Sequence, residues 1–165
     1  MCGPRRTLSS WDRAGRRSGC LSLIDNYPPT PENNRTMDAA AALDELKFDA
    51  NGLIPLIVQD AKNGQVLMMA WMNREALELT LSTGKIHTYS RSRKRLALKG
   101  ESSRHFQHVK EFWTDCDKDV VLFKVDQDVA ACHEGYRSCF YRRNDNGSWT
   151  TVGERAFDPD KVYHK

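Results

Sequence analysis

The local signal that most restricts the fold of this chain is an Asn-Gly pair, Asn63-Gly64, between two apolar runs. The runs cover residues 54–59 and 66–71 and are rich in Ile, Val, Leu and Met. Asn-Gly in this setting is typical of a β-hairpin, because both residues tolerate the left-handed backbone conformation that a tight turn between twisted strands requires. The sequence therefore predicts two antiparallel strands joined at this turn.

A helix and further strands are expected after this hairpin. Asn73 is a favoured N-cap for a helix over 74–83, and Gly84 suits its end. The helix has an apolar stripe formed by Ala76, Leu77, Thr80 and Leu81. Further strands are expected over 86–92, 106–114, 120–127 and 138–143, and the turn at Asp145-Asn146-Gly147 leads into 148–152. The pattern predicts an α+β fold, a single compact domain with a mostly antiparallel sheet and few helices.

Length and charge narrow the class of protein. The 165 residues, 39% of them hydrophobic, suffice for one core. No apolar run approaches the roughly 20 residues that cross a bilayer, so we expect a soluble, cytoplasmic protein without a membrane partner. Residues 1–36 carry six arginines and three acids, whereas residues 37–165 carry 19 basic and 19 acidic side chains. A main domain without net charge argues against general nucleic-acid binding.

The N-terminal residues differ from the rest in composition. Residues 1–36 contain scattered arginines, two cysteines and a Pro-rich stretch, and we expect a disordered extension there. An organelle-targeting peptide is the alternative, which Asp12 and Asp25 weaken. The main domain is expected over 37–152, beginning with a short helix capped by Asp38, and a C-terminal tail over 153–165.

Three thiols and three carboxylates gather in the segment 115–139. Cys116, Cys132 and Cys139 are separated by 15 and then 6 residues. Thiolates are soft ligands that suit zinc, whereas carboxylates suit magnesium or calcium. Three cysteines leave one position of a tetrahedral zinc for water, as in a catalytic site. The hard-metal candidates are Asp115, Asp117 and Asp119.

Simpler interpretations exist for each part of this cluster. Cysteines in such a chain are often small buried apolar residues, and their spacing matches no zinc-finger pattern. An Asp-x-Asp-x-Asp run is often a solvated turn, but it is no EF-hand loop, since Val120 and Asp126 stand where that loop needs Gly and Glu. The position of Cys116 inside the Asp triplet, and of His133 directly after Cys132, favours a functional site.

A basic run is the second concentrated signal. Guanidinium groups bind phosphate oxygens through paired hydrogen bonds, and serine hydroxyls add neutral donors. By composition alone, such runs are more often solvated faces or nucleic-acid patches. The candidate substrate-binding residues are Ser90, Arg91, Ser92, Arg93 and Lys99.

Four segments, taken in order, resemble one enzyme family. They are LIPLIVQDAKNGQVLMMAWMNREAL, TYSRSRKRLALKGESS, DCDKD and ACHEGYRSCFYRR, between Leu53 and Arg143. Together they are similar to phosphoribosyl-AMP cyclohydrolase of histidine biosynthesis in its monofunctional form. The resemblance implies a nucleotide substrate and a homodimer with shared active sites. It also implies Mg²⁺ at Asp115, Asp117 and Asp119, and Zn²⁺ at Cys116, Cys132 and Cys139, with Cys116 donated across the dimer interface.

The expected reaction opens the adenine ring of N1-(5-phosphoribosyl)-AMP at the N1–C6 bond, using water activated by zinc. It needs a group that moves a proton, and His133 is the first candidate because imidazole changes charge near neutral pH. A fourth zinc ligand or a structural histidine is the alternative for His133. The sequence departs from the family pattern at Ala97, Leu98, Arg104 and Glu134.

Two other functions use the same residues. A zinc-stabilised, non-catalytic binding module would need the cysteines but not the Asp triplet. A zinc-dependent purine deaminase would share the activated water, but its H-x-E and P-C-x-x-C signature is absent.

Overall fold

A computed structural model describes residues 39–163 of the chain. The expected N-terminal extension and the Asp38 cap lie outside the described residues. The short helix expected near the start of the domain is present as α1 (Ala39–Asp44). A second short helix, α3 (Pro159–Tyr163), lies at the other end of the described chain.

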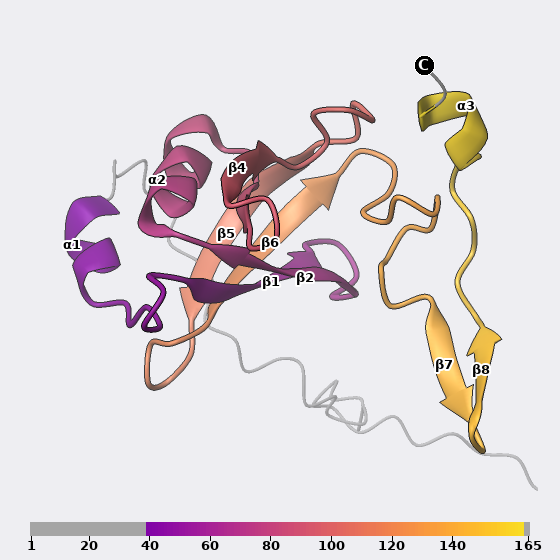
Figure 1. Cartoon of the computed structure of the whole chain (residues 1–165), viewed down its shortest axis with the longest axis horizontal. Coiled ribbons are helices and arrows are strands. Elements are labelled where there is room, and N and C mark those ends of the chain that lie inside the picture. The colour runs from indigo at the N-terminus through magenta and orange to yellow at the C-terminus, as the bar shows by residue number, and fades with distance from the viewer. Residues whose placement is uncertain (1–38, 164–165) are drawn as a thin grey trace, which may run out of the picture. The chain divides into compact units, whose positions relative to one another are not determined.

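The centre of the fold is a four-stranded mixed sheet (Figure 1). Strand order is β2-β1-β6-β5, with an antiparallel pair on each side and a parallel β1–β6 pair between them. The expected hairpin over 54–71 is therefore confirmed, and the sheet is mixed, because one of its three strand pairs is parallel. Its strands are β1 (Ile54–Asp60), β2 (Val66–Met72), β5 (Gln107–Thr114) and β6 (Val121–Gln127).

The parallel pair joins two central strands that each bury one whole face. Alternate residues of β1 and of β6 are buried, in the same pattern along each strand. Parallel strands need a long crossover, and residues 61–120 provide it. The residue pattern within one strand does not show which distant strand pairs with it.

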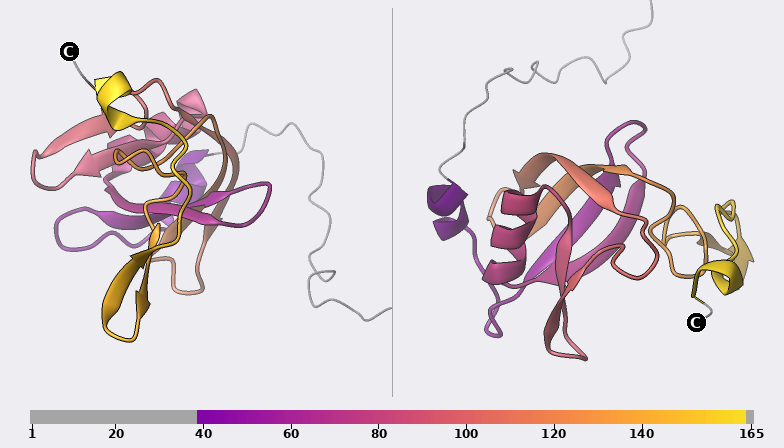
Figure 2. Two further views of the ribbon diagram at one scale, coloured as in Figure 1. Left: turned by 90° about the vertical axis from the view of Figure 1, so that its right-hand side faces the viewer. Right: turned by 90° about the horizontal axis from the view of Figure 1, so that it is seen from above.

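Helix α2 (Arg74–Thr83) forms where the sequence predicts it. The side chain of Asn73 accepts a hydrogen bond from Ala76 N at 2.9 Å. Gly84 ends the helix with φ 66°, and its N–H donates to Thr80 O. The buried face contains Ala76, Leu77 and Thr80, and it packs on the sheet (Figure 2).

Two hairpins differ from their expected bounds. The expected strand 86–92 ends earlier, as β3 (His87–Ser90), because the chain turns at 91–94 and returns as β4 (Arg95–Leu98), which the sequence did not predict. Asn146 (φ 51°) and Gly147 (φ 93°) form the predicted turn between β7 (Arg142–Asp145) and β8 (Ser148–Thr151).

The expected strand over 138–143 is wrong in its first half. Ser138 Oγ donates to Val66 O at 2.8 Å, and Cys139 N donates to Leu67 O at 2.7 Å. These bonds hold the segment across the start of β2, so its first residues do not form a strand. Strand β7 begins only at Arg142.

The core lies between the sheet and α2. Its largest fully buried side chains include Phe123, Ile54, Leu56, Leu67, Met72 and Leu77. Within residues 39–163, no helix combines the length and the apolar character that crossing a bilayer requires. The C-terminal segment returns to the domain, since Val152 N donates to Tyr141 O and Ala156 N to Gly135 O. The domain boundaries at 37, 152 and 153 stay a prediction.

Candidate metal centre

The three aspartates share the loop between β5 and β6, which we call the Asp loop (residues 115–120). Oxygen atoms of Asp115, Asp117 and Asp119 lie within 4.8 Å of one another, and all three residues are exposed. Backbone geometry brings them together, because Lys118 adopts φ 64° and turns the chain. Asp115 Oδ1 then accepts hydrogen bonds from Asp119 N at 3.1 Å and Val120 N at 3.3 Å.

The segment after α1 holds the Asp loop in position. Lys47 N donates to Lys118 O at 2.7 Å. The Lys118 ammonium also pairs with the Glu45 carboxylate. The loop is therefore fastened at the residue between two of its aspartates.

The electrostatics of the Asp loop suit a hard cation. The negative charge of Asp117, with some burial and the charge of Asp115, raises the pKa of Asp119. Burial also acts to raise the pKa of Asp115, but hydrogen bonds from Val120, Asp117 and Asp119 outweigh it and lower that pKa. Clustered carboxylates repel one another, and a divalent cation would remove this cost. The donor set fits magnesium.

A second loop, which we call the Cys loop (residues 129–141), brings two thiols together. Cys132 is buried, and its N–H donates to Tyr136 O at 3.2 Å. Cys139 is exposed as a whole residue, but its thiol is partly buried and close enough to Cys132 for the two to interact. Burial and the neighbouring Cys132 raise the pKa of Cys139 to about 11. Two adjacent thiols that lose their protons on binding fit a soft metal such as zinc.

Cys116 does not join these two thiols within one chain. It is exposed on the Asp loop. Among residues 39–163, the Asp triplet is the only cluster of three or more potential metal ligands. The chain thus holds a thiol beside the carboxylates and a thiol pair elsewhere.

The phosphate-binding candidates divide into two groups. Ser90, Arg91, Ser92 and Arg93 lie at the β3–β4 turn, where Ser90 Oγ is 3.4 Å from Ser92 Oγ. The guanidinium of Arg91 lies 4.6 Å from the ring centre of Trp71. Lys99 lies elsewhere, because its ammonium donates to Ala131 O in the Cys loop. Burial lowers the pKa of Lys99, and the nearby Cys139 and Cys132 oppose this effect.

His133 lies in the Cys loop and projects into solvent. Its side chain is 82% exposed, and Nε2 lies 3.2 Å from Glu134 Oε1. Glu134 is one of the departures from the family pattern. The imidazole is thus available to a ligand or to a partner subunit.

A polar network anchors the Cys loop to the sheet. The Arg137 guanidinium pairs with the Asp60 carboxylate, whose side chain is only 1% exposed. Gln127 Nε2 donates to Arg137 O at 2.9 Å, and Gln107 Nε2 donates to Gln127 Oε1 at 2.8 Å. This network was not predicted from the sequence. A signal was present, since Asp60 continues the buried alternation of Ile54, Leu56 and Val58.

Comparison with known proteins identifies the family. A family model described as phosphoribosyl-AMP cyclohydrolase matches residues 68–141. Over 124 residues, the chain is 60% identical to the phosphoribosyl-AMP cyclohydrolase of Pelotomaculum thermopropionicum, covering 74% of this chain and 96% of that protein. This chain belongs to the phosphoribosyl-AMP cyclohydrolase family.

Other phosphoribosyl-AMP cyclohydrolases give the same result. The Methanospirillum hungatei protein is 58% identical over 120 residues, covering 73% of this chain and 89% of the relative. The Chromobacterium violaceum protein is 53% identical over 127 residues, covering 76% of this chain and 96% of the relative. The resemblance that the sequence motifs indicated is confirmed. All the predicted site residues lie within the region that the family model matches.

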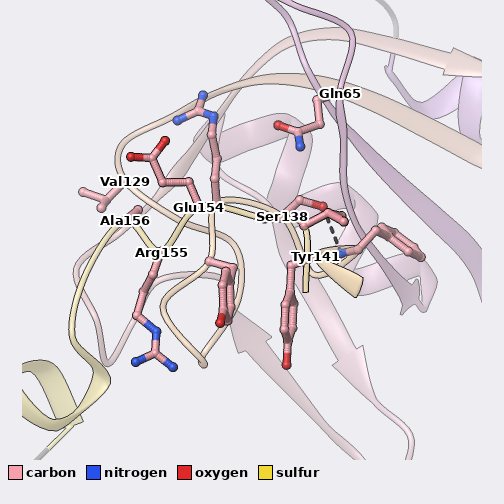
Figure 3. A pocket seen from close by; sticks show the side chains of 12 residues that line it. Gln65, Val129, Ser138, Tyr141, Glu154, Arg155 and Ala156 are labelled. Carbon is pink, nitrogen blue, oxygen red and sulfur yellow. Dashed lines mark hydrogen bonds between the residues drawn. The ribbon is translucent and has the colours of Figure 1, made fainter. Parts of the chain in front are cut away.

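Pockets of this cyclohydrolase lie on different sides of the two loops. One pocket, about 540 Å³, lies between the Cys loop and the C-terminal segment, and Gln65, Glu154 and Arg155 are among the residues that line it (Figure 3). Its wall includes Tyr136 and Tyr141, whose rings stack 3.8 Å apart. None of the predicted site residues lines it. Smaller pockets of about 380 Å³ lie beside Cys139 and beside Asp119.

Proposed function

We propose that this chain opens the adenine ring of N1-(5-phosphoribosyl)-AMP by hydrolysis, as a step of histidine biosynthesis. Family membership supports the overall reaction. The observation that carries the detailed proposal is the presence of two separate donor sets, three clustered carboxylates and a pair of adjacent thiols. Hard and soft ligands kept apart in this way suit two different metals in one active site.

The reaction adds water to C6 of the purine and breaks the C6–N1 bond, while N1 takes up a proton. The ring carbon keeps its amino nitrogen as a carboxamide, so ammonia is not released. Zinc held by Cys116, Cys132 and Cys139 would supply hydroxide at neutral pH, because it lowers the pKa of bound water to about 7. His133 is our candidate for moving the proton, since it adjoins Cys132 and is exposed.

The remaining predicted residues bind the charged ends of the substrate in this proposal. Magnesium at Asp115, Asp117 and Asp119 would offset negative charge near the phosphates. Ser90, Arg91, Ser92 and Arg93 provide donors at one exposed turn. Lys99 was predicted with them, but its bond to Ala131 O favours a contact with the Cys loop.

A homodimer completes the zinc site in this proposal. Cys116 of one subunit would join Cys132 and Cys139 of the other. Exposed apolar side chains near Cys139 support a partner surface there, including Phe140 (59% exposed) and Trp149 (69% exposed). Trp149 lies on the β7–β8 hairpin, which extends away from the sheet (Figure 1). A hairpin that projects an exposed tryptophan is a suitable contact for a second subunit.

The test is to offer N1-(5-phosphoribosyl)-AMP to the purified protein with zinc and magnesium. We expect an ultraviolet change on ring opening and no release of ammonia. Ammonia release would instead identify a deaminase. Zinc binding without any turnover would indicate a non-catalytic binding module.

A further inference from the structure

A pocket beside the Asp loop has the composition of a nucleobase site. It measures about 380 Å³, within the roughly 300–1,000 Å³ common for small-ligand sites. Trp71 and Phe48 contribute aromatic surface, Leu53 and Pro55 contribute aliphatic surface, and Asp119 of the triplet lies at its edge. No residue predicted to bind phosphate lines this pocket directly.

We infer that this pocket binds the purine of the substrate, with Trp71 as the stacking surface and Lys47 as a phosphate-binding cation at its edge. The inference rests on the proposed function and adds the position of the base. Trp71 and Lys47 were absent from the residues that the sequence analysis selected.

The ring of Trp71 already attracts a planar cation. The Arg91 guanidinium lies 4.6 Å from its centre. A purine alkylated at N1 is planar and electron-poor, which favours stacking on an electron-rich indole. The purine is also the only flat aromatic part of the substrate, and the phosphates would remain outside the pocket.

Two positive charges lie close to Trp71. Lys47 lines the pocket, and its charge acts on the carboxylate of Asp119. Arg91 lies on the Trp71 ring, and its charge acts on Asp49, another lining residue. A nucleotide with two phosphate arms needs more than one cation around its base. Lys47 and Arg91 are two cations close to Trp71.

The pocket wall is hydrogen-bonded to the candidate metal loop. Lys47 N donates to Lys118 O at 2.7 Å. The side chain of Asp49 holds the next turn, accepting hydrogen bonds from Asn51 N and Leu53 N at 2.8 Å each. A base on Trp71 is thereby kept in a defined position relative to Asp119. Such fixed placement of a substrate near a metal lowers the entropic barrier to reaction.

Steady-state kinetics with the zinc- and magnesium-loaded enzyme tests the inference. Base–aromatic stacking is worth a few kcal/mol at most, so we expect Trp71→Leu to raise KM on the order of tenfold. Trp71→Phe keeps a stacking face, and KM should stay within about threefold of the wild-type value. Lys47→Met should also raise KM. Lys62→Met, in the exposed β1–β2 turn, is the matched control and should leave KM unchanged.

A second measurement separates this inference from the proposed function. Calorimetric titration with AMP reports base binding without turnover, and we expect Trp71→Leu to weaken it. If wild-type protein opens the ring but Trp71→Leu and Lys47→Met, with normal zinc content and circular dichroism, keep wild-type KM and AMP affinity, the pocket assignment is wrong. If AMP binding depends on Trp71 but the wild-type protein shows no turnover, the pocket stands and the proposed reaction fails.

Discussion

At the scale of single residues, the ion pair between Asp60 and Arg137 links the sheet to the Cys loop. Asp60 closes the buried face of β1, and Arg137 lies two residues before Cys139. Burial acts to raise the pKa of Asp60, but hydrogen bonds from Arg137 and from Lys62 N outweigh it, and the pKa is below its ordinary value. The pair therefore stabilises the fold only while Asp60 is ionised.

Asp60→Asn should destabilise the protein by about 2 kcal/mol at pH 7, because it leaves Arg137 without its carboxylate. The lowered folded-state pKa means that the unfolded state binds protons first as the pH falls. The difference in unfolding free energy between the wild type and Asp60→Asn is thus complete above the unfolded-state pKa of about 4. It is lost below that value, as the pH falls through the folded-state pKa of Asp60. Urea unfolding of both proteins between pH 7 and pH 3 measures this. A stability difference that persists undiminished at pH 3 would assign the effect to another cause.

The Asp triplet allows a second test at this scale. Asp117→Asn removes one charged oxygen ligand without touching any cysteine, so zinc content should be unchanged. We expect most of the magnesium-dependent activity to be lost. Elemental analysis and a magnesium titration of the rate measure the two effects. An unaltered magnesium dependence would show that the hard-metal assignment is mistaken.

At the scale of elements, the Cys loop depends on a close contact with the C-terminal segment. Gly135 has φ 86°, and a Cβ atom there would lie 2.2 Å from Phe157 O. Gly147, in the β7–β8 turn, has a similar φ of 93°, but a Cβ there would meet no atom within 4 Å. The two glycines thus share the same backbone requirement and differ only in the space around them.

Gly135→Ala should therefore cost more stability than Gly147→Ala. Each substitution lowers the free energy of unfolding by about 1 kcal/mol, because alanine must adopt a left-handed conformation. Only Gly135→Ala must also displace residues 155–157, and we expect a total loss of about 3 kcal/mol. Denaturant unfolding curves of the two variants provide the comparison. Equal losses would mean that the C-terminal segment adjusts freely.

Local features of this fold could be predicted from the sequence, because their causes lie within a few residues. The Asn63-Gly64 turn, the Asn73 cap and the Gly84 stop each act through neighbouring backbone groups. The parallel β1–β6 pair and the placement of 138–141 across β2 depend on residues far away in the chain. The Asp triplet was predicted for the same local reason, as one short loop brings it together. The position of Trp71 beside Asp119 required the folded chain.

At the scale of the whole molecule, the separation of Cys116 from the Cys132–Cys139 pair leads to a complementation experiment. In a dimer with shared sites, Cys116→Ser and Cys132→Ser homodimers each lack a ligand in both sites and should be inactive. A mixed dimer has one site with all three wild-type cysteines. Mixing the two inactive proteins should restore activity, up to one site per mixed dimer.

Subunit exchange must be verified in that experiment, for example by native mass spectrometry of differently tagged chains. Mixing Cys116→Ser with itself is the control and should stay inactive. Confirmed mixed dimers without recovered activity would favour sites contained within one chain.

The parallel β1–β6 pair also has a kinetic consequence. Strands β1 and β2 are joined by a short turn, as are β5 and β6, so each pair can form early from nearby segments. The central pairing joins segments separated by residues 61–120, so we expect it to form last, after the two hairpins. We expect conservative mutations in the two hairpins to change the folding rate, and mutations at the β1–β6 seam to change mainly the unfolding rate. The Cys loop is bonded to β2 and to the end of β1, so the thiol pair would come together only after the two halves of the sheet have docked.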